Sequence, residues 1–352
     1  MDMIKIPTKG MGRDAWLEAR RGTIGGSDAA TALGLNPYSS PYALWAEKTG
    51  AIQPEDISEK ESVRLGNYLE DYVAHRFSEI TGKKVRRENY ILKNQAFPWA
   101  HANVDRLVIG EKAGLECKTT SELNLKRFRG GEYPANYYCQ CMHYMAVTGY
   151  PKWYLAVLIG NREVRTFEIL RDEAEISALM DVERRFWDCI NTKTPPEIDG
   201  MRATGDTLDA IHEGGGGCID LEAVSQDIQS YIALKAQIKI LQEQADACAN
   251  GIKAFMGQCT AGKLGNISVS WARYQTSRFD RAAFLRDNPS IDLTKYNRVT
   301  EAQRFTVRRR DSNGKQHDSA SSGGQSARQT TAEQRHSYDE RYPGWGWYAE
   351  TI

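Results

Sequence analysis

The spacing of apolar residues predicts an α/β domain in the first part of the chain. Apolar positions at a 3.6-residue period over 58–81 predict an amphipathic helix that ends at Gly82. Two apolar runs on either side of Gly160 predict a β-hairpin. The full expectation is helices at 14–50 (in short pieces), 58–81, 134–149 and 172–191, strands at 85–92, 153–159 and 163–169, and a hairpin at 104–119. This order indicates a domain that ends near residue 195.

The pattern changes after this domain. Residues 196–219 contain a run of four glycines, which predicts a linker. Residues 220–308 predict a C-terminal extension that consists of a long helix and a small β part. Its smaller expected elements are strands at 264–274 and 303–308 and a helix at 280–287. Residues 309–352 are rich in Ser, Gly and Gln, which predicts a disordered tail.

The long helix of the extension carries a heptad seam. Its apolar residues follow one another in alternating steps of three and four, and they are Tyr231, Leu234, Ile238, Leu241, Ala245, Cys248, Ile252 and Phe255. Two interpretations remain open at this point. The seam packs on the helix's own domain, or it makes a helical hairpin or a coiled-coil contact.

Composition and charge exclude several classes of protein. The chain has 352 residues, of which 41% are hydrophobic and 26% are charged, as is usual for a soluble globular protein. It shows neither a signal peptide nor an apolar run long enough to span a membrane. Seven cysteines without a CxxC pair indicate free thiols in a reducing cytoplasm. The net charge is zero, so any binding of nucleic acid must depend on local basic patches.

The hairpin at 104–119 holds the most informative charged residues. A two-residue turn at Gly110 and Glu111 would place Asp105 opposite Glu116 and Asn103 opposite Lys118, all on one face. Opposed carboxylates repel each other unless a cation lies between them. A hard ion such as Mg²⁺ is suited to this position, because it binds one or two carboxylates and keeps several waters.

Other groups of the hairpin and two helices extend this candidate site. The carbonyl oxygen of Cys117 could add a metal ligand, and Lys118 could orient or deprotonate water or stabilise charge on a phosphate. Glu70 lies at the edge of the apolar stripe of its helix, and Gln140 is a polar residue within an apolar helix. For each of these residues a purely structural role remains the alternative, and for His101 it is the expectation.

Five segments in the same order resemble a known family. They are WLEARRGTIGGSDAATALGLNPYSSPYALW, GNYLEDYVAHRF, NVDRLV, LECKTT and YYCQCMHYMAVTGYPKWYLAVL. They resemble the YqaJ-like viral recombinases, which are relatives of phage lambda exonuclease within the PD-(D/E)xK nuclease superfamily. The resemblance covers about residues 10–195 and implies a restriction-endonuclease-like fold, with a central mixed sheet flanked by helices. It also implies a Mg²⁺-dependent 5′→3′ exonuclease acting on double-stranded DNA ends, for which Mn²⁺ could substitute.

The resemblance also assigns roles to single residues. It implies catalytic roles for Glu70, Asp105, Glu116, Lys118 and Gln140, with Asp105 and Glu116 as metal ligands. It places Arg20, Ser27 and Gln140 at the 5′-terminal phosphate, and less firmly Asn103, which stands where some relatives have Ser. Arg106 departs from the family, whose members usually have Gly after the aspartate, so the local loop or the approach of DNA is expected to differ.

Partners and alternatives follow from the same resemblance. Relatives form ring-shaped oligomers, often trimers, and act beside a single-strand annealing protein, so we expect a homo-oligomer and such a partner. We expect a phage or prophage protein in the bacterial cytoplasm, without membrane contact. Two other functions remain open: a related endonuclease, and a non-catalytic DNA-binding or assembly module.

Overall fold

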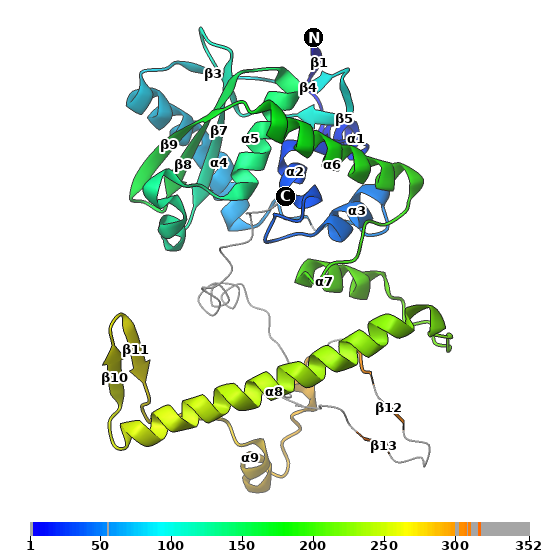
Figure 1. Ribbon diagram of the computed structural model, residues 1–352, viewed down its shortest axis with the longest axis vertical. Helices are drawn as coiled ribbons and strands as arrows, with labels where there is room; N and C mark the ends of the chain where they lie inside the picture. The colour runs from blue at the N-terminus through cyan, green and yellow to red at the C-terminus, as the bar shows by residue number, and fades with distance from the viewer. Residues whose placement is uncertain (1–2, 55, 300–302, 308, 311–315, 318–352) are drawn as a thin grey trace. The chain divides into compact units, whose positions relative to one another are not determined.

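The computed structural model describes residues 3–54, 56–299, 303–307, 309–310 and 316–317 (Figure 1). The chain divides into two compact units, unit 1 (Met1–Gly215) and unit 2 (Gly216–Ile352). The predicted fold class is confirmed: unit 1 is a mixed α/β structure, and unit 2 holds the long helix with a small β part. Most of the predicted tail at 309–352 lies outside the described residues.

A five-stranded mixed sheet forms the centre of unit 1. Its strands, in order across the sheet, are β3 (Val85–Arg87), β6 (Arg106–Val108), β7 (Ala113–Thr120), β8 (Lys152–Ile159) and β9 (Glu163–Leu170). Only β7 and β8 are parallel to each other among these neighbours. Because parallel neighbours need a long connection, the chain crosses over between them through η1 (Glu122–Gly131) and α5 (Ala135–Thr148).

Helices cover both faces of this sheet (Figure 1). α4 (Glu61–Thr81) packs on one face, with Phe77 fully buried there. α5 covers the opposite face, and α6 (Glu173–Thr192) packs against α5. Residues of β8 alternate between the two cores: Tyr154 and Ala156 lie with α4, and Trp153, Leu155 and Val157 lie with α5. The predicted helices 58–81, 134–149 and 172–191 are therefore confirmed as the layers that cover the sheet.

A second, four-stranded sheet lies beside the first in unit 1. Its order is β1 (Met3–Pro7), β4 (Tyr90–Asn94), β5 (Phe97–Ala102) and β2 (Ile24–Gly25). The predicted single strand at 85–92 is wrong, because β3 and β4 belong to different sheets. Between them the buried carboxylate of Glu88 binds Lys5 at 3.0 Å, and this ion pair holds the chain where it changes sheets. β5 was not predicted.

The short helices expected at 14–50 are confirmed as α1 (Arg13–Arg21), α2 (Gly26–Ala32) and α3 (Pro41–Thr49). The predicted linker at 196–219 differs from the structure, because it contains α7 (Arg202–Ile211), which packs against α3 within unit 1. Thr204 of α7 is buried and donates a hydrogen bond to Ser40 at 2.7 Å. A helix fixed by threonines leaves little apolar periodicity in the sequence, which explains why the pattern did not predict α7.

Unit 2 is built around α8 (Ser225–Met256). The strand expected at 264–274 is instead a hairpin, because Gly265 turns with φ 58° between its two strands. Residues 303–307 are not a strand, so that prediction is wrong for the residues described. The remaining elements are η2 (Glu222–Val224), β10 (Ala261–Leu264), β11 (Ile267–Ser270), α9 (Arg281–Asp287), η3 (Thr294–Tyr296), β12 (Arg309–Arg310) and β13 (Gln316–His317).

Two general features concern both units. All seven cysteines lie within the described residues, and they are free thiols, as predicted. Within the described part of the chain, every helix is too short or too polar to cross a lipid bilayer.

Candidate active site

The hairpin formed by β6 and β7 has the predicted register. Arg106 pairs with Leu115 and Leu107 with Gly114, and the same register extended by one residue would place Asp105 opposite Glu116. The connection is longer than the predicted two-residue turn, because residues 109–112 all lie outside the strands. Asp105 lies one residue before β6, and its Oδ2 accepts a hydrogen bond from the backbone N–H of Cys117 at 2.8 Å. This bond holds the aspartate over the middle of β7.

Glu116 is the most deeply buried carboxylate of the hairpin. Its Oε1 lies 2.6 Å from Lys118 Nζ and accepts a hydrogen bond from Gln140 Nε2 at 2.7 Å. Its Oε2 is buried without a hydrogen-bond partner among the described residues. The structure thus brings together four of the predicted residues, and we refer to Asp105, Glu116 and Lys118 as the carboxylate site.

The carboxylate site has an excess of negative charge. Burial, and then repulsion by Glu116 and Glu70, raise the pKa of Asp105 well above its usual value. Burial alone would lower the pKa of Lys118, but attraction by Glu116 and Asp105 outweighs it, so this pKa is raised. Lys118 alone therefore does not offset the buried carboxylates, and the site favours a further cation.

A divalent metal ion fits these residues. The unpaired Oε2 of Glu116 and the carboxylate of Asp105 are oxygen donors, which hard cations such as Mg²⁺ prefer. Among the described residues, no group of three or more His, Cys, Asp or Glu side chains has metal-binding spacing. Two carboxylates are nevertheless enough for Mg²⁺, which keeps several waters. The role predicted for the Cys117 carbonyl stays a prediction.

Arg106 ties α4 to the start of β6. Its side chain is only 5% exposed, and its two terminal nitrogens bind Glu70 Oε1 at 2.5 Å and Asp71 Oδ1 at 2.6 Å. It also donates to the backbone carbonyl of Asp105 at 2.6 Å. Glu70 thus lies close to the carboxylate site, as predicted, but its carboxylate is held by an arginine. The sequence marked Arg106 only as a departure, and a charged residue directly before an apolar pair in the hairpin was the available signal.

Gln140 belongs to a chain of hydrogen bonds that the sequence did not reveal in full. Its Nε2 also donates to the hydroxyl of Tyr144 at 2.8 Å, and that hydroxyl donates to the carbonyl of Asn103 at 2.9 Å. Gln140 and Tyr144 are four residues apart and therefore share one face of the helix, which was the signal in the sequence that could have indicated this contact. Gly26 is required beneath this ring, since a Cβ there would lie 2.5 Å from Tyr144 Cε1. The buried Oδ1 of Asn103 has no partner among the described residues.

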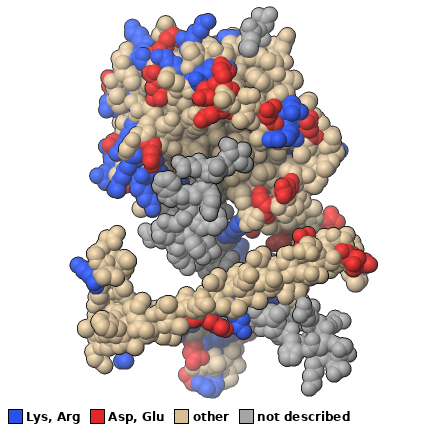
Figure 2. Space-filling view, viewed as in Figure 1, with Lys and Arg blue, Asp and Glu red and all other residues tan. Residues whose placement is uncertain are grey.

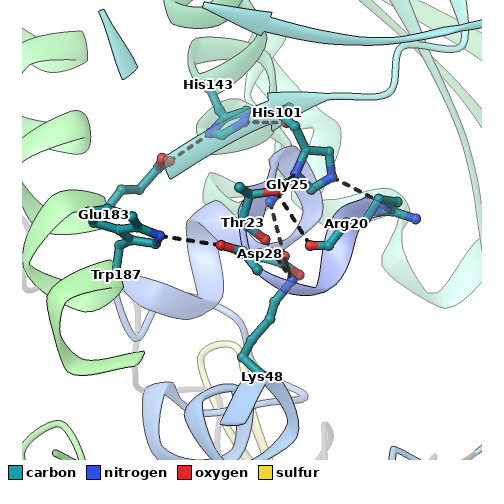
Figure 3. A network of polar contacts seen from close by, with 10 residues as sticks. Arg20, Thr23, Gly25, Asp28, Lys48, His101, His143, Glu183 and Trp187 are labelled. Atoms are coloured by element: carbon teal, nitrogen blue, oxygen red, sulfur yellow. Dashed lines mark hydrogen bonds and ion pairs between the residues drawn. The ribbon is translucent and has the colours of Figure 1, made fainter. Parts of the chain in front are cut away.

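Arg20 is fixed from two sides. Its guanidinium lies over the ring of Trp16, with its carbon 4.0 Å from the ring centroid. Its Nε donates to His101 Nε2 at 3.1 Å (Figure 3). Burial, and then the charge of Arg20, lower the pKa of His101 to about 2, so the ring is neutral. Because a guanidinium only donates, the ring proton is on Nδ1 and faces Thr23 Oγ1 at 2.9 Å.

On the side of His101 away from Arg20 lies a fully buried histidine and glutamate pair (Figure 3). His143 Nδ1 and Glu183 Oε1 are 2.7 Å apart, and both side chains have no exposed surface. His143 Nε2 donates to the carbonyl of His101 at 2.9 Å, which joins α5 and α6 to β5. Attraction by Glu183 outweighs the effect of burial and raises the pKa of His143. We call these residues the histidine network: Arg20, Thr23, His101, His143 and Glu183.

Ser27 and the loop that precedes it lie near Arg20. Ser27 lies exposed in the first turn of α2. The loop before it approaches Arg20 closely, since a Cβ at Gly25 would lie 3.5 Å from a terminal nitrogen of Arg20. Asp28 accepts from the N–H of Gly25 at 3.0 Å and pairs with Lys48 at 2.7 Å (Figure 3). This pair was not predicted, and it fixes the start of α2, which carries Ser27.

A basic surface with a groove lies at η1. Figure 2 shows Lys and Arg side chains gathered over this end of unit 1, where Lys126 and Arg129 are exposed. An open groove of about 640 Å³ is lined by residues 35, 37, 127 and 131–136. Tyr137 follows directly on this lining, and its ring centroid lies 5.5 Å from Lys118 Nζ. Tyr137 therefore connects the segment that lines the groove to Lys118 of the carboxylate site.

Comparison with known proteins identifies the family. Residues 15–151 match the model of the YqaJ-like viral recombinase domain. Over 304 residues the chain is 39% identical to the uncharacterized protein YqaJ of Bacillus subtilis (strain 168). The matched segment covers 85% of this chain and 95% of that protein. The chain therefore belongs to the YqaJ-like viral recombinase family, and the predicted resemblance is confirmed.

More distant similarities are shorter or weaker. A segment of 40 residues is 60% identical to a protein of African swine fever virus, over 11% of this chain and 12% of that protein. The crystal structure of the alkaline exonuclease LHK-Exo from Laribacter hongkongensis matches with a TM-score of 0.44 at 19% identity. That match covers 51% of this chain and 93% of the exonuclease chain. A phage related exonuclease from Haemophilus somnus 129PT gives a TM-score of 0.33 at 13% identity, over 49% of this chain and 96% of that chain.

Proposed function

We propose that this protein is a metal-dependent exonuclease that degrades linear double-stranded DNA in the 5′→3′ direction and leaves 3′ single-stranded overhangs. One observation carries the proposal. Asp105 and Glu116 converge from the two arms of the hairpin, and the buried Oε2 of Glu116 lacks a partner, among the described residues, beside the ammonium of Lys118. Carboxylates that share a cation next to an ammonium group are suited to phosphodiester hydrolysis.

The residues of the site divide the work between them. A Mg²⁺ ion held by Asp105 and Glu116 supplies Lewis acidity toward the scissile phosphate. The ammonium group of Lys118 donates hydrogen bonds to the phosphate oxygens and stabilises the negative charge that develops on them. Gln140 keeps Glu116 in one orientation through its bond to Oε1. Arg106 holds Glu70 and the backbone of Asp105, so the aspartate does not have to be ordered when DNA binds.

Arg20 is proposed to bind the 5′-terminal phosphate. Its Nε is occupied by His101, while its terminal nitrogens have no hydrogen-bond partner among the described residues. A guanidinium stacked on Trp16 and fixed at Nε presents its remaining donors with little loss of side-chain entropy, and arginine suits bidentate phosphate binding. Ser27 and Asn103 are proposed as further donors to this phosphate.

The biological setting belongs to the same proposal. We infer a phage or prophage enzyme of the bacterial cytoplasm that prepares DNA ends for homologous recombination. It acts as a ring-shaped homo-oligomer, a trimer by family resemblance, beside a single-strand annealing protein. The neutral net charge suits a ring whose basic residues concentrate where DNA passes. The basic surface at η1, where Lys126 and Arg129 are exposed, is one such surface on unit 1.

A comparison of DNA substrates tests the proposal. We expect Mg²⁺-dependent shortening of a linear duplex, faster with a 5′-phosphate than with a 5′-hydroxyl, and no attack on covalently closed circles. Cleavage of closed circles would support a related endonuclease instead. If the wild-type chain leaves linear duplex intact while calorimetry detects bound Mg²⁺ or Mn²⁺, it is a binding module and the proposal is wrong. Full activity of Lys118→Ala would also contradict it.

A further inference from the structure

The long helix α8 is apolar and uncovered. It has 32 residues, and none of them is buried against the described part of the chain. Figure 2 shows that little charge lies along the face of α8 turned to the viewer. Exposed fractions along the seam include 56% for Leu234, 57% for Ile238, 62% for Leu241 and 95% for Phe255. The ring of Phe305 contacts Tyr231 at one end of the seam, at a centroid distance of 6.0 Å. An apolar stripe of this length marks an interaction surface.

The spacing of the seam shows what kind of surface can cover it. Eight apolar positions follow a 3.5-residue repeat, whereas a helix that packs on a globular core follows 3.6. A sustained 3.5 repeat keeps one stripe facing a second helix of the same length. In the described residues of unit 2 the other helices are far shorter, and α9 spans only seven residues. No other described helix of unit 2 is long enough to cover the seam, which favours a long helix from another chain.

The order of large and small residues along the seam identifies that helix. When the sequence is reversed about Glu243, each seam position falls on another seam position. The resulting pairs are Tyr231 with Phe255, Leu234 with Ile252, Ile238 with Cys248, and Leu241 with Ala245. Aromatic residues thus meet at both ends, and near the centre a large residue always meets a small one. Such complementary volumes fill a helix interface without voids.

We propose that α8 pairs with α8 of a second copy of this chain as an antiparallel two-stranded coiled coil centred on Glu243. Because three helices cannot pair two by two within one trimeric ring, such a pair joins chains of two different rings. A parallel pair would place each residue opposite itself. The neighbouring layers at Ala245 and Cys248 would then be small on both sides, and they would leave a cavity in the seam. The antiparallel pair avoids this cavity, because Leu241 and Ile238 of one copy fill the two small positions of the other.

The residues that flank the seam fit the same arrangement. Among the eight flanking positions, 230, 235, 237, 242, 244, 249, 251 and 256, only Lys235 is charged. In the antiparallel pair the flanking neighbour of Lys235 is Met256 of the second copy, so no like charges meet along the edge. On the outer surface, Lys239 lies level with Ala247 of the second copy, one residue from Asp246, whereas a parallel pair would place it level with another Lys239. Charge and volume therefore favour the same orientation.

Thiol cross-linking tests the orientation directly in the full-length chain. The exposed thiols Cys218 and Cys259 are first replaced by Ser, which leaves Cys248 as the thiol of the seam. With a short bismaleimide, we expect Ile238→Cys to give a cross-linked dimer through Cys248 of the other copy. Ala236→Cys, on the outer face of α8, is the matched control and should give none. Cross-linking of Cys248 without any added cysteine would show a parallel pair and overturn the proposal.

The mass in solution tests the association itself. We expect Leu241→Asp to lower the mass measured by sedimentation at least twofold, while Asn250→Asp on the outer face leaves it unchanged. If Leu241→Asp does not change the mass and Ile238→Cys does not cross-link, α8 does not pair with itself. The inference does not depend on nuclease activity, since neither residue lies in unit 1. A failed nuclease assay and a failed cross-link therefore remain separate results.

Discussion

Two clusters of buried charged and polar side chains in unit 1 differ in their charge balance, although each holds one carboxylate oxygen, Glu183 Oε2 or Glu116 Oε2, without a hydrogen-bond partner among the described residues. In the histidine network, His101 is neutral and accepts from Arg20, and His143 faces Glu183 at 2.7 Å. In the carboxylate site, Asp105 and Glu116 repel each other and share one ammonium group. The histidine network holds α5, α6 and β5 together. The carboxylate site, with two carboxylates and one ammonium group, favours the binding of a further cation. The difference separates the scaffold of the site from its chemistry.

The substitution Glu116→Gln should produce the largest effect, because it removes the imbalance. We expect DNA degradation to fall about 1,000-fold, equivalent to about 4 kcal/mol in the activation free energy. The free energy of unfolding without metal should not fall, since the like-charge repulsion with Asp105 is relieved. Kinetics on linear duplex and urea unfolding measure the two quantities. Glu122→Gln is the control, because the side chain of Glu122 on η1 is 51% exposed. If Glu116→Gln retains a tenth of the wild-type activity, the assignment is wrong.

The substitution Glu183→Ala breaks the histidine network and leaves His143 buried without its partner. We expect a loss of about 3–5 kcal/mol in the free energy of unfolding, because removing one partner of a buried pair leaves the other buried and unpaired. Denaturant unfolding of the wild-type and variant chains provides the measurement. Asp188→Asn on the same helix, where the side chain is 55% exposed, should change stability by less than about 0.5 kcal/mol. Equal stabilities for the two variants would show that the network is not a scaffold.

The substitution Arg106→Gln affects the link between α4 and the carboxylate site. We expect a 10- to 100-fold loss in apparent Mg²⁺ affinity, because groups that orient metal ligands typically contribute this much. Calorimetric titration with Mg²⁺ measures this affinity without any need for turnover. Asp71→Asn removes one exposed partner of Arg106, but Arg106 keeps its bonds to Glu70 and Asp105. The Mg²⁺ affinity should therefore change by less than about threefold. An unchanged Mg²⁺ affinity in Arg106→Gln would assign this arginine to packing alone.

The pH dependence of stability gives the smallest expected effect and concerns the histidine network. His101 has a pKa of about 2 when folded and near 6.5 when unfolded. The neutral ring therefore stabilises the fold fully above pH 6.5, and this stabilisation is lost as the pH falls below 6.5. Between pH 6.5 and 5.5 we expect the wild type to lose about 1 kcal/mol relative to His101→Gln. Urea unfolding at both pH values measures this, and parallel losses in the two chains would show that His101 is not the titrating group.

The sequence predicted those parts of the site that depend on neighbouring residues. The alternation along the hairpin gave the correct register, so Asp105 was placed opposite Glu116 before any coordinates. Arg106 could not be assigned, because its partners on α4 are 35 and 36 residues away in the sequence. The pair of His143 and Glu183 spans 40 residues. Such contacts leave no periodic signal, since each partner is a single polar residue on an otherwise apolar face.

The sequence by itself determined the main helices, the hairpin register, the heptad repeat of α8 and the family. These features depend on periods of two, 3.5 and 3.6 residues or on contiguous motifs, which are local properties of the chain. Only the tertiary structure decided that 85–92 divides between two sheets, that α7 belongs to unit 1, and that Arg106 holds Glu70. The physical reason is that burial and charge pairing depend on which elements pack together. Local periodicity shows which face of an element is apolar, but not which element will cover that face.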